Sequence, residues 1–170
     1  VEGIYQIPVV IRNLNNPILV KMLIKKNIDV LINFTRKTAG LSVCLTSIVS
    51  ATLAVTYPFL DWFFPSEIIR ESYSVLLVLL GGMVIYSIFI PFDYILITGG
   101  FPGLQSIFMS SNMAVNIGFN YVLIPKFGLM GACTATVIAF LSAVLLLNCL
   151  SVLFLKLPGG ILLKRKGLIQ

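Results

Sequence analysis

The pattern of charged and apolar positions divides this chain into four long apolar stretches. No Asp, Glu, Lys or Arg occurs in residues 38–60, 72–92, 94–125 and 127–155. A helix needs about 20 apolar residues to cross a hydrocarbon core of about 30 Å. We therefore expect four membrane-spanning helices, at about residues 39–60, 73–98, 105–124 and 129–155.

Glycine and proline mark the interruptions in this pattern. Gly81, Gly82 and Pro91 interrupt the second expected span. The segments TGGFPG (98–103) and IPKFG (124–128) predict tight turns between spans, because Pro and Gly favour turn geometry over regular helix.

The composition supports a membrane protein over a soluble one. Of the 170 residues, 58% are hydrophobic and 11% are charged, and the mean hydropathy is +1.03. A soluble domain carries roughly a quarter charged residues. Buried helices of a soluble protein would not account for four such stretches in one short chain. The expected fold is an all-α integral membrane protein.

Residues 17–37 show a different pattern from the four spans. Polar side chains recur every four residues and form one stripe, at Lys21, Lys25, Asp29, Asn33 and Lys37. The stripe predicts an amphipathic helix at the cytoplasmic interface, with its lysines, Lys26 included, toward anionic headgroups. A cytoplasmic connecting helix packed on the bundle is the alternative.

The remaining N-terminal residues complete the expected domain organisation. Residues 1–12 are too short to span and are interpreted as the end of a truncated helix. Because the chain begins at Val1 within an apolar stretch, we expect it to be a piece of a longer protein that lacks its N-terminal part. The expected divisions are a linker over 1–37, four transmembrane helices over 38–155 and a basic tail over 156–170.

Basic residues predict the orientation of the chain in the membrane. Short cytoplasmic loops carry an excess of Lys and Arg. Ten of the twelve basic residues flank the four spans on one side: Arg12, Lys21, Lys25, Lys26, Arg36, Lys37, Lys156, Lys164, Arg165 and Lys166. The other side holds Arg70 and Lys126, the latter interpreted as an interfacial anchor. Both ends of the chain are therefore expected on the cytoplasmic side of the cell membrane. No basic surface for nucleic acid is visible.

Three asparagines form a polar face within the third expected span. Asn112, Asn116 and Asn120 are spaced four residues apart, so each is displaced by about 40° from the one before. Lipid cannot satisfy an amide, so this face must point at other helices or at a water-filled cavity. Hydrogen bonding between helices and a role in lining a substrate path are both open on the sequence alone.

The fourth expected span carries small residues at the same spacing. Gly131, Ala135, Ala139 and Ala143 recur every four residues and predict close packing of helix backbones. Thr136 can hydrogen-bond within the helix or across it, and it is a further candidate for the substrate path.

Asp93 is the single acid among the apolar stretches. If the second span ends near Phe92, this carboxylate lies at the cytoplasmic interface; if the span continues to Thr98, it lies inside. An ionisable residue within a membrane usually lines a functional cavity. We therefore include Asp93 among the candidates for a substrate or coupling site.

The sequence offers little support for metal, redox or catalytic chemistry. It has no histidine, and its three cysteines, Cys44, Cys133 and Cys149, have no Cys-x-x-Cys spacing. No paired carboxylates, Ser-His arrangement or phosphate-binding glycine loop is present. We expect no cofactor, no metal and no enzymatic activity.

The segment NMAVNIGFNYVLIPKFGLMGACTATVIAFLSA, residues 112–143, resembles the penultimate and last core helices of the polysaccharide and O-antigen flippases. These belong to the multidrug/oligosaccharidyl-lipid/polysaccharide exporter superfamily. Cys133 stands where that family more often has alanine. The positions that match its motif are Asn116, Asn120, Pro125, Lys126, Gly128, Gly131, Ala132, Ala135 and Thr136.

The resemblance implies the C-terminal part of a transporter with 12 or 14 helices in two bundles. Its function would be to move lipid-linked oligosaccharide across the cytoplasmic membrane by alternating access. Its partners would be the oligosaccharide substrate, membrane lipids and the missing N-terminal half. A polysaccharide polymerase or glycosyltransferases would be further partners.

One departure from that family keeps two alternatives open. O-antigen flippases line the lumen with basic residues, whereas no Lys or Arg lies within an expected span here. A cation-coupled multidrug extruder of the same superfamily is the first alternative, and Asp93 would suit it. A small membrane anchor subunit without transport activity is the second.

Overall fold

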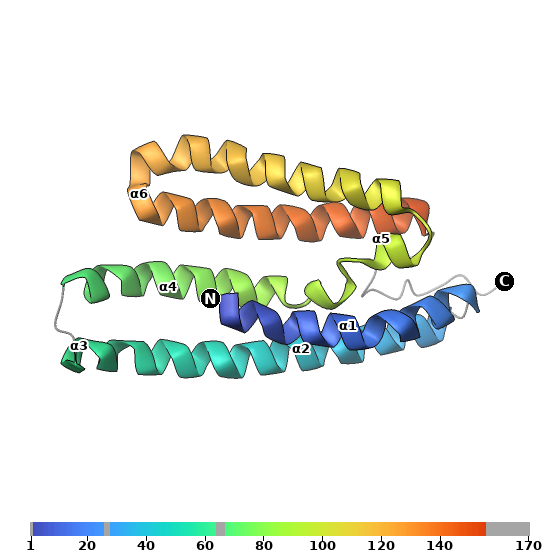
Figure 1. Ribbon diagram of the computed structural model, residues 1–170, viewed down its shortest axis with the longest axis horizontal. Helices are drawn as coiled ribbons and strands as arrows, with labels where there is room; N and C mark the ends of the chain where they lie inside the picture. The colour runs from blue at the N-terminus through green and yellow to red at the C-terminus, as the bar shows by residue number, and fades with distance from the viewer. Residues whose placement is uncertain (1, 26–27, 64–66, 156–170) are drawn as a thin grey trace.

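The computed structural model describes residues 2–25, 28–63 and 67–155, and within these ranges all regular structure is helical. Figure 1 shows the helices running roughly along one common direction. The elements in chain order are α1 (Glu2–Ile24), α2 (Ile28–Thr56), η1 (Tyr57–Phe59), α3 (Leu60–Phe63), α4 (Glu67–Tyr86), η2 (Ile90–Phe92), α5 (Ile95–Thr98) and α6 (Pro102–Phe154).

The described helices are those of a multi-pass membrane protein, and the expected all-α membrane fold is confirmed. Three of them, Glu2–Ile24, Val30–Phe59 and Pro102–Phe154, are long and apolar enough to cross a membrane. The bent pair Ser72–Tyr86 and Ile90–Thr98 makes a fourth if it is counted as one broken span.

Apolar side chains lie on the outside of the helix bundle and several polar side chains lie inside it, as expected for a protein surrounded by lipid. Large apolar side chains such as Leu145 and Leu153 are exposed, whereas Ser42 and Thr46 of α2 are fully buried. Because lipid offers no hydrogen bonds, polar groups are more stable inside the bundle than on its surface. Ser42 donates a hydrogen bond of 2.7 Å to the carbonyl oxygen of Ser87, just beyond the end of α4.

Helix α6 doubles back on itself and forms a helical hairpin (Figure 1). Its single residue with non-helical backbone angles is Gly128 (φ 55°, ψ −132°). The limbs on either side of Gly128 correspond to the third and fourth expected spans. The reversal falls within the predicted turn 124–128, although Pro125 still lies inside the helix, in its last turn before Gly128.

The substitution Gly128→Ala is expected to lower the free energy of unfolding by about 1–3 kcal/mol, because a residue with a Cβ is strained at this positive φ. Thermal unfolding of the purified protein in detergent, followed by circular dichroism, measures the change. Gly103→Ala is the matched control, since a Cβ at Gly103 meets nothing within 4 Å. Equal unfolding temperatures for the two variants would contradict the argument.

The N-terminal region differs from the expectation of one amphipathic helix over residues 17–37. That stretch is divided between the end of α1 and the beginning of α2, so the single helix is wrong. Residues 2–12 belong to α1, which is 23 residues long, contains Pro8 and Pro17, and is therefore longer than the 12-residue segment expected from the sequence. Helices in a membrane tolerate proline where neighbouring helices surround it, and Pro8 is buried.

The second expected span is broken at a different place from the glycine pair. Helix α4 continues through Gly81 and Gly82 to Tyr86, and the chain then bends by 43° before η2 and α5. A Cβ at Gly82 would clash with the side chain of Val137, so this glycine serves the close approach of α4 and α6. Ile90, Pro91 and Phe92 of the break are all buried.

The predicted row of small residues in α6 lies in the interior of the bundle. Gly131, Ala135, Ala139 and Ala143 are all buried, and the row continues with buried Leu147 and Ser151. At Gly131 the lack of a side chain lets the second limb of α6 lie against the backbone of Leu123 in the first limb. The second limb also contacts α4, the most extensive partner of α6. The rings of Tyr86 and Phe140 stack across this contact, with centroids 4.5 Å apart.

Candidate substrate cavity

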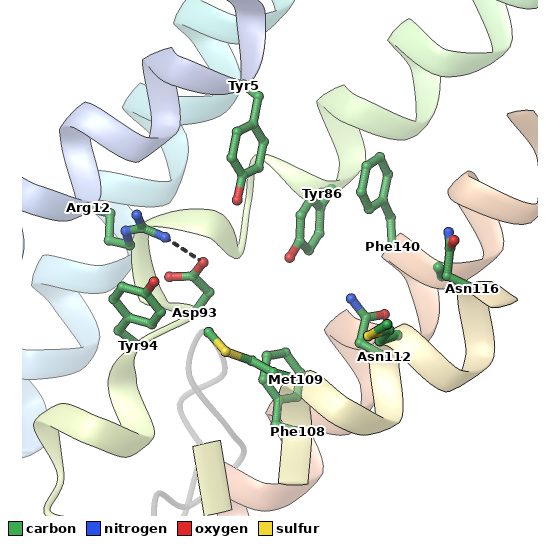
Figure 2. A pocket seen from close by; sticks show the side chains of 12 residues that line it. Tyr5, Arg12, Tyr86, Asp93, Tyr94, Phe108, Met109, Asn112, Asn116 and Phe140 are labelled. Atoms are coloured by element: carbon green, nitrogen blue, oxygen red, sulfur yellow. Dashed lines mark hydrogen bonds and ion pairs between the residues drawn. The ribbon is translucent and has the colours of Figure 1, made fainter. Parts of the chain in front are cut away.

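A cavity of about 370 Å³ lies where α1, the break after α4 and both limbs of α6 meet. Figure 2 shows that its wall combines aromatic, amide and charged side chains. The polar wall residues are Tyr5, Arg12, Tyr86, Asp93, Tyr94, Asn112 and Asn116. The volume lies within the range of about 300–1,000 Å³ that is typical of ligand pockets.

An ion pair between α1 and the residue after η2 forms one side of the cavity. Arg12 Nη1 lies 2.8 Å from Asp93 Oδ2, and the two side chains are only 12% and 9% exposed. The Arg12 guanidinium carbon is also 4.2 Å from the ring centroid of Tyr94. Each charge therefore has a partner that offsets part of its desolvation.

Asp93 is buried within the protein, beside the break after α4. Its residue exposure is 6%, and the broken span continues past it to Thr98. Gln105, itself 2% exposed, donates a hydrogen bond of 2.7 Å to the Asp93 carbonyl oxygen. This bond ties the break to the beginning of α6 and holds the carboxylate in position.

Arg12 is the main site residue that the sequence analysis missed. The basic-residue count assigned it to a cytoplasmic flank, and no Lys or Arg was expected within a span, whereas the candidate span Glu2–Ile24 contains it. Arg12 lies at the middle of α1, a helix apolar enough to cross the membrane. The prolines of α1 concealed that helix, and a hydropathy window over residues 2–24 was the signal that could have found it.

The three asparagines do not share one environment. Asn112 and Asn116 line the cavity, whereas Asn120 lines a separate, almost wholly apolar hollow with Tyr121 and Pro125. Asn120 Nδ2 donates to both the side-chain and the backbone oxygen of Asn116, at 2.9 Å each. The drift of about 40° per step carries the third amide out of the cavity.

Three buried polar atoms of the cavity wall have no hydrogen-bond partner. They are Arg12 Nε, Asp93 Oδ1 and Asn112 Oδ1. Leaving such an atom unsatisfied costs about 1–3 kcal/mol. Each of these atoms has almost no exposed surface, so a polar ligand or a water molecule would complete its bonds only after the wall moves.

The other candidate residues lie outside the cavity wall. Thr136 donates a hydrogen bond of 3.0 Å to the Ala132 carbonyl oxygen within α6. Lys126 is exposed beside the reversal at Gly128, and Lys21 and Lys25 are exposed at the end of α1. Lys26 and the expected basic tail 156–170 lie outside the described residues.

Tyr5, Tyr86 and Tyr94 are further wall residues that sequence reasoning did not select. Each belongs to an apolar segment. Tyrosine occurs both in contacts between helices and at membrane interfaces, so its presence in such a segment does not indicate a cavity. Only the fold brings the three phenol groups to one cavity (Figure 2).

Among the described residues, no group of three or more His, Cys, Asp or Glu side chains could hold a metal ion. Cys44 and Cys149 are exposed and Cys133 is buried, and none of them forms a disulfide. The chemistry of the cavity is therefore that of hydrogen bonds, one ion pair and aromatic faces.

Comparison with known proteins finds no matching family model, no similar curated protein and no similar solved structure.

Proposed function

We propose that this chain is part of a membrane transporter that moves lipid-linked oligosaccharide across the cytoplasmic membrane by alternating access. The observation that carries the proposal is the polar cavity between helices whose outer surfaces are apolar. A purely structural bundle has no need to hold an ion pair and two amides around a space of about 370 Å³. Ionisable residues within membranes usually mark a substrate or ion path.

The cavity is built from the parts of the chain that would move in such a transporter. It lies beside a broken helix, and discontinuous helices commonly form the binding sites of transporters. Asp93 belongs to the break, Arg12 to α1 and Asn112 to α6, so a ligand in the cavity would contact three separate segments. Relative movement of these segments would change access to it.

The proposal includes the context in which the chain would work. The C-terminal end of α6 would lie on the cytoplasmic side, and a second helical bundle, not contained in these residues, would complete the lumen. The oligosaccharide would cross through the polar lumen while its lipid tail stays among membrane lipids. A polysaccharide polymerase or glycosyltransferases would act before or after the transport step, and the chain itself would not be an enzyme.

The ion pair favours the flippase over the alternative of an organic-cation extruder. An extruder would use Asp93 as a free negative charge, but Arg12 lies 2.8 Å from its carboxylate. The anchor alternative leaves the cavity without a role.

Complementation tests the proposed function. The natural full chain should restore surface glycan in cells that lack their own polysaccharide flippase, and Asn112→Leu should abolish most of that restoration. This substitution removes the hydrogen-bonding amide from the cavity wall, and the leucine side chain narrows the cavity. The matched control is Asn33→Leu, an exposed position on α2. Equal export by both variants at equal membrane expression would contradict the proposal.

A further inference from the structure

We infer that the cavity binds an uncharged sugar unit of the substrate and that the Arg12–Asp93 pair selects against charged ligands. The inference rests on the proposed function and deepens it. It assigns the part of the substrate that this cavity holds, and it places the pyrophosphate and the lipid elsewhere in the transporter.

The charge balance of the wall carries the first step of the inference. Arg12 and Asp93 are the two ionisable acid and base side chains of the lining, and they are paired with each other at 2.8 Å. The cavity therefore has no net charge. A buried ion without a counter-charge is strongly disfavoured, so an anion could bind well only by displacing Asp93 from Arg12, and a cation only by displacing Arg12 from Asp93.

The aromatic contact of Arg12 strengthens this argument. The ring of Tyr94 lies over the guanidinium at 4.2 Å, so two groups already hold the charge in place. A phosphate oxygen would have to compete with both the carboxylate and the ring. The geometry is that of a fixed polar wall and not that of a free anion site.

The remaining hydrogen-bonding capacity fits hydroxyl groups. Arg12 Nε is an unpaired donor, and Asp93 Oδ1 and Asn112 Oδ1 are unpaired acceptors; all three are buried, so a ligand reaches them by small movements of the wall. A sugar hydroxyl both donates and accepts, so it can satisfy either kind of atom. Figure 2 shows Arg12 and Asp93 on one side and Asn112 on another, with the Tyr5 and Tyr86 hydroxyls between them.

Aromatic side chains supply the apolar half of the site. Tyr86 is stacked on Phe140, with an interplanar angle of 5°, and Phe108 also lines the cavity. A pyranose ring has apolar C–H faces as well as polar edges. The combination of amides, a paired carboxylate and rigid rings around one cavity therefore matches both surfaces of a sugar.

Protection of an introduced thiol tests the inference without requiring transport. The natural full chain, with its native cysteines replaced by alanine and Met109→Cys in the cavity wall, is reconstituted in lipid nanodiscs. Its rate of labelling by N-ethylmaleimide is then measured. Methyl α-glucoside, methyl α-galactoside and N-acetylglucosamine are the neutral probes, inorganic pyrophosphate the anion and tetraphenylphosphonium the cation. At least one neutral sugar should slow labelling, and neither ion should.

Charge variants sharpen the test. Asp93→Asn leaves the guanidinium unneutralised, so pyrophosphate should now protect the thiol. Arg12→Gln leaves the carboxylate free, so tetraphenylphosphonium should protect it instead. Asn112→Leu should weaken sugar protection by about tenfold, because one hydrogen bond to a buried partner is lost, while Asn33→Leu should leave it unchanged.

The double variant Arg12→Gln/Asp93→Asn keeps the test decisive if the single charge variants fail to fold. It contains no unpaired charge, and neither ion should protect it. Protection of the parent protein by pyrophosphate or tetraphenylphosphonium, or by none of the sugars, would overturn the inference. Successful complementation alongside such a result would leave the flippase proposal standing, so the two failures are distinguishable.

Discussion

Asp93→Asn is expected to destabilise the protein by about 3–5 kcal/mol, because it leaves the Arg12 guanidinium buried without its counter-charge. The two side chains are 12% and 9% exposed, so water can stabilise the remaining charge only in part. Arg12→Gln should have an effect of similar size for the converse reason. These are the largest losses that we expect from near-isosteric changes in this chain.

The double variant distinguishes loss of the pair from loss of a single charge. Arg12→Gln/Asp93→Asn removes both charges together, and it should recover most of the stability that either single change costs. Thermal unfolding in detergent, followed by circular dichroism, reports all three variants. The control is Glu2→Gln, an exposed acid in the first turn of α1. A double variant less stable than both single variants would show that the ionic contact itself supplies net stability.

Gly131→Ala is expected to disrupt the hairpin of α6, although it adds only one methyl group. A Cβ at this position would clash with the carbonyl oxygen and carbon of Leu123 in the opposite limb. These are backbone atoms, so no rotamer change can relieve the contact and the limbs must separate. Overpacking typically costs about 1–3 kcal/mol, and we expect the upper part of that range here.

Gly118→Ala is the matched control for the hairpin. Gly118 lies on the first limb of α6, and a Cβ there meets nothing within 4 Å. Its unfolding temperature should equal or exceed that of the parent, because alanine favours helix over glycine. The midpoint of thermal unfolding in detergent separates the two substitutions. If Gly131→Ala unfolds at the same temperature as Gly118→Ala, the close approach of the limbs does not limit stability.

The sequence could predict those features of the fold that depend on local physics. Long stretches without charge favour helices that cross a membrane, because lipid can solvate neither charges nor open backbone groups. The turn near Gly128 is also local, since Pro and Gly restrict or free the backbone at their own positions. The row from Gly131 to Ala143 indicated a buried face through its spacing, and all four residues of that row are buried.

Other features of the fold depend on contacts between helices, and these contacts can override the local pattern of a single segment. The period of four over residues 17–37 suggested one helix, yet α1 ends at Ile24 and α2 begins at Ile28. Pairing the two helices buries Leu19 and Leu31. The glycine pair in α4 likewise suggested a break, whereas Gly82 allows Val137 of α6 to approach.

The candidate site shows the same division most clearly. The sequence by itself determined that Asn112 must face other helices or a cavity, because lipid would leave its amide unsatisfied, and it left the depth of Asp93 open. Only the tertiary structure decided their partners. Arg12 and Asp93 are 81 positions apart, and their contact exists because α1 packs against the break after α4. The attraction between the two charges depends on their distance in space, so it cannot be inferred from their spacing along the chain.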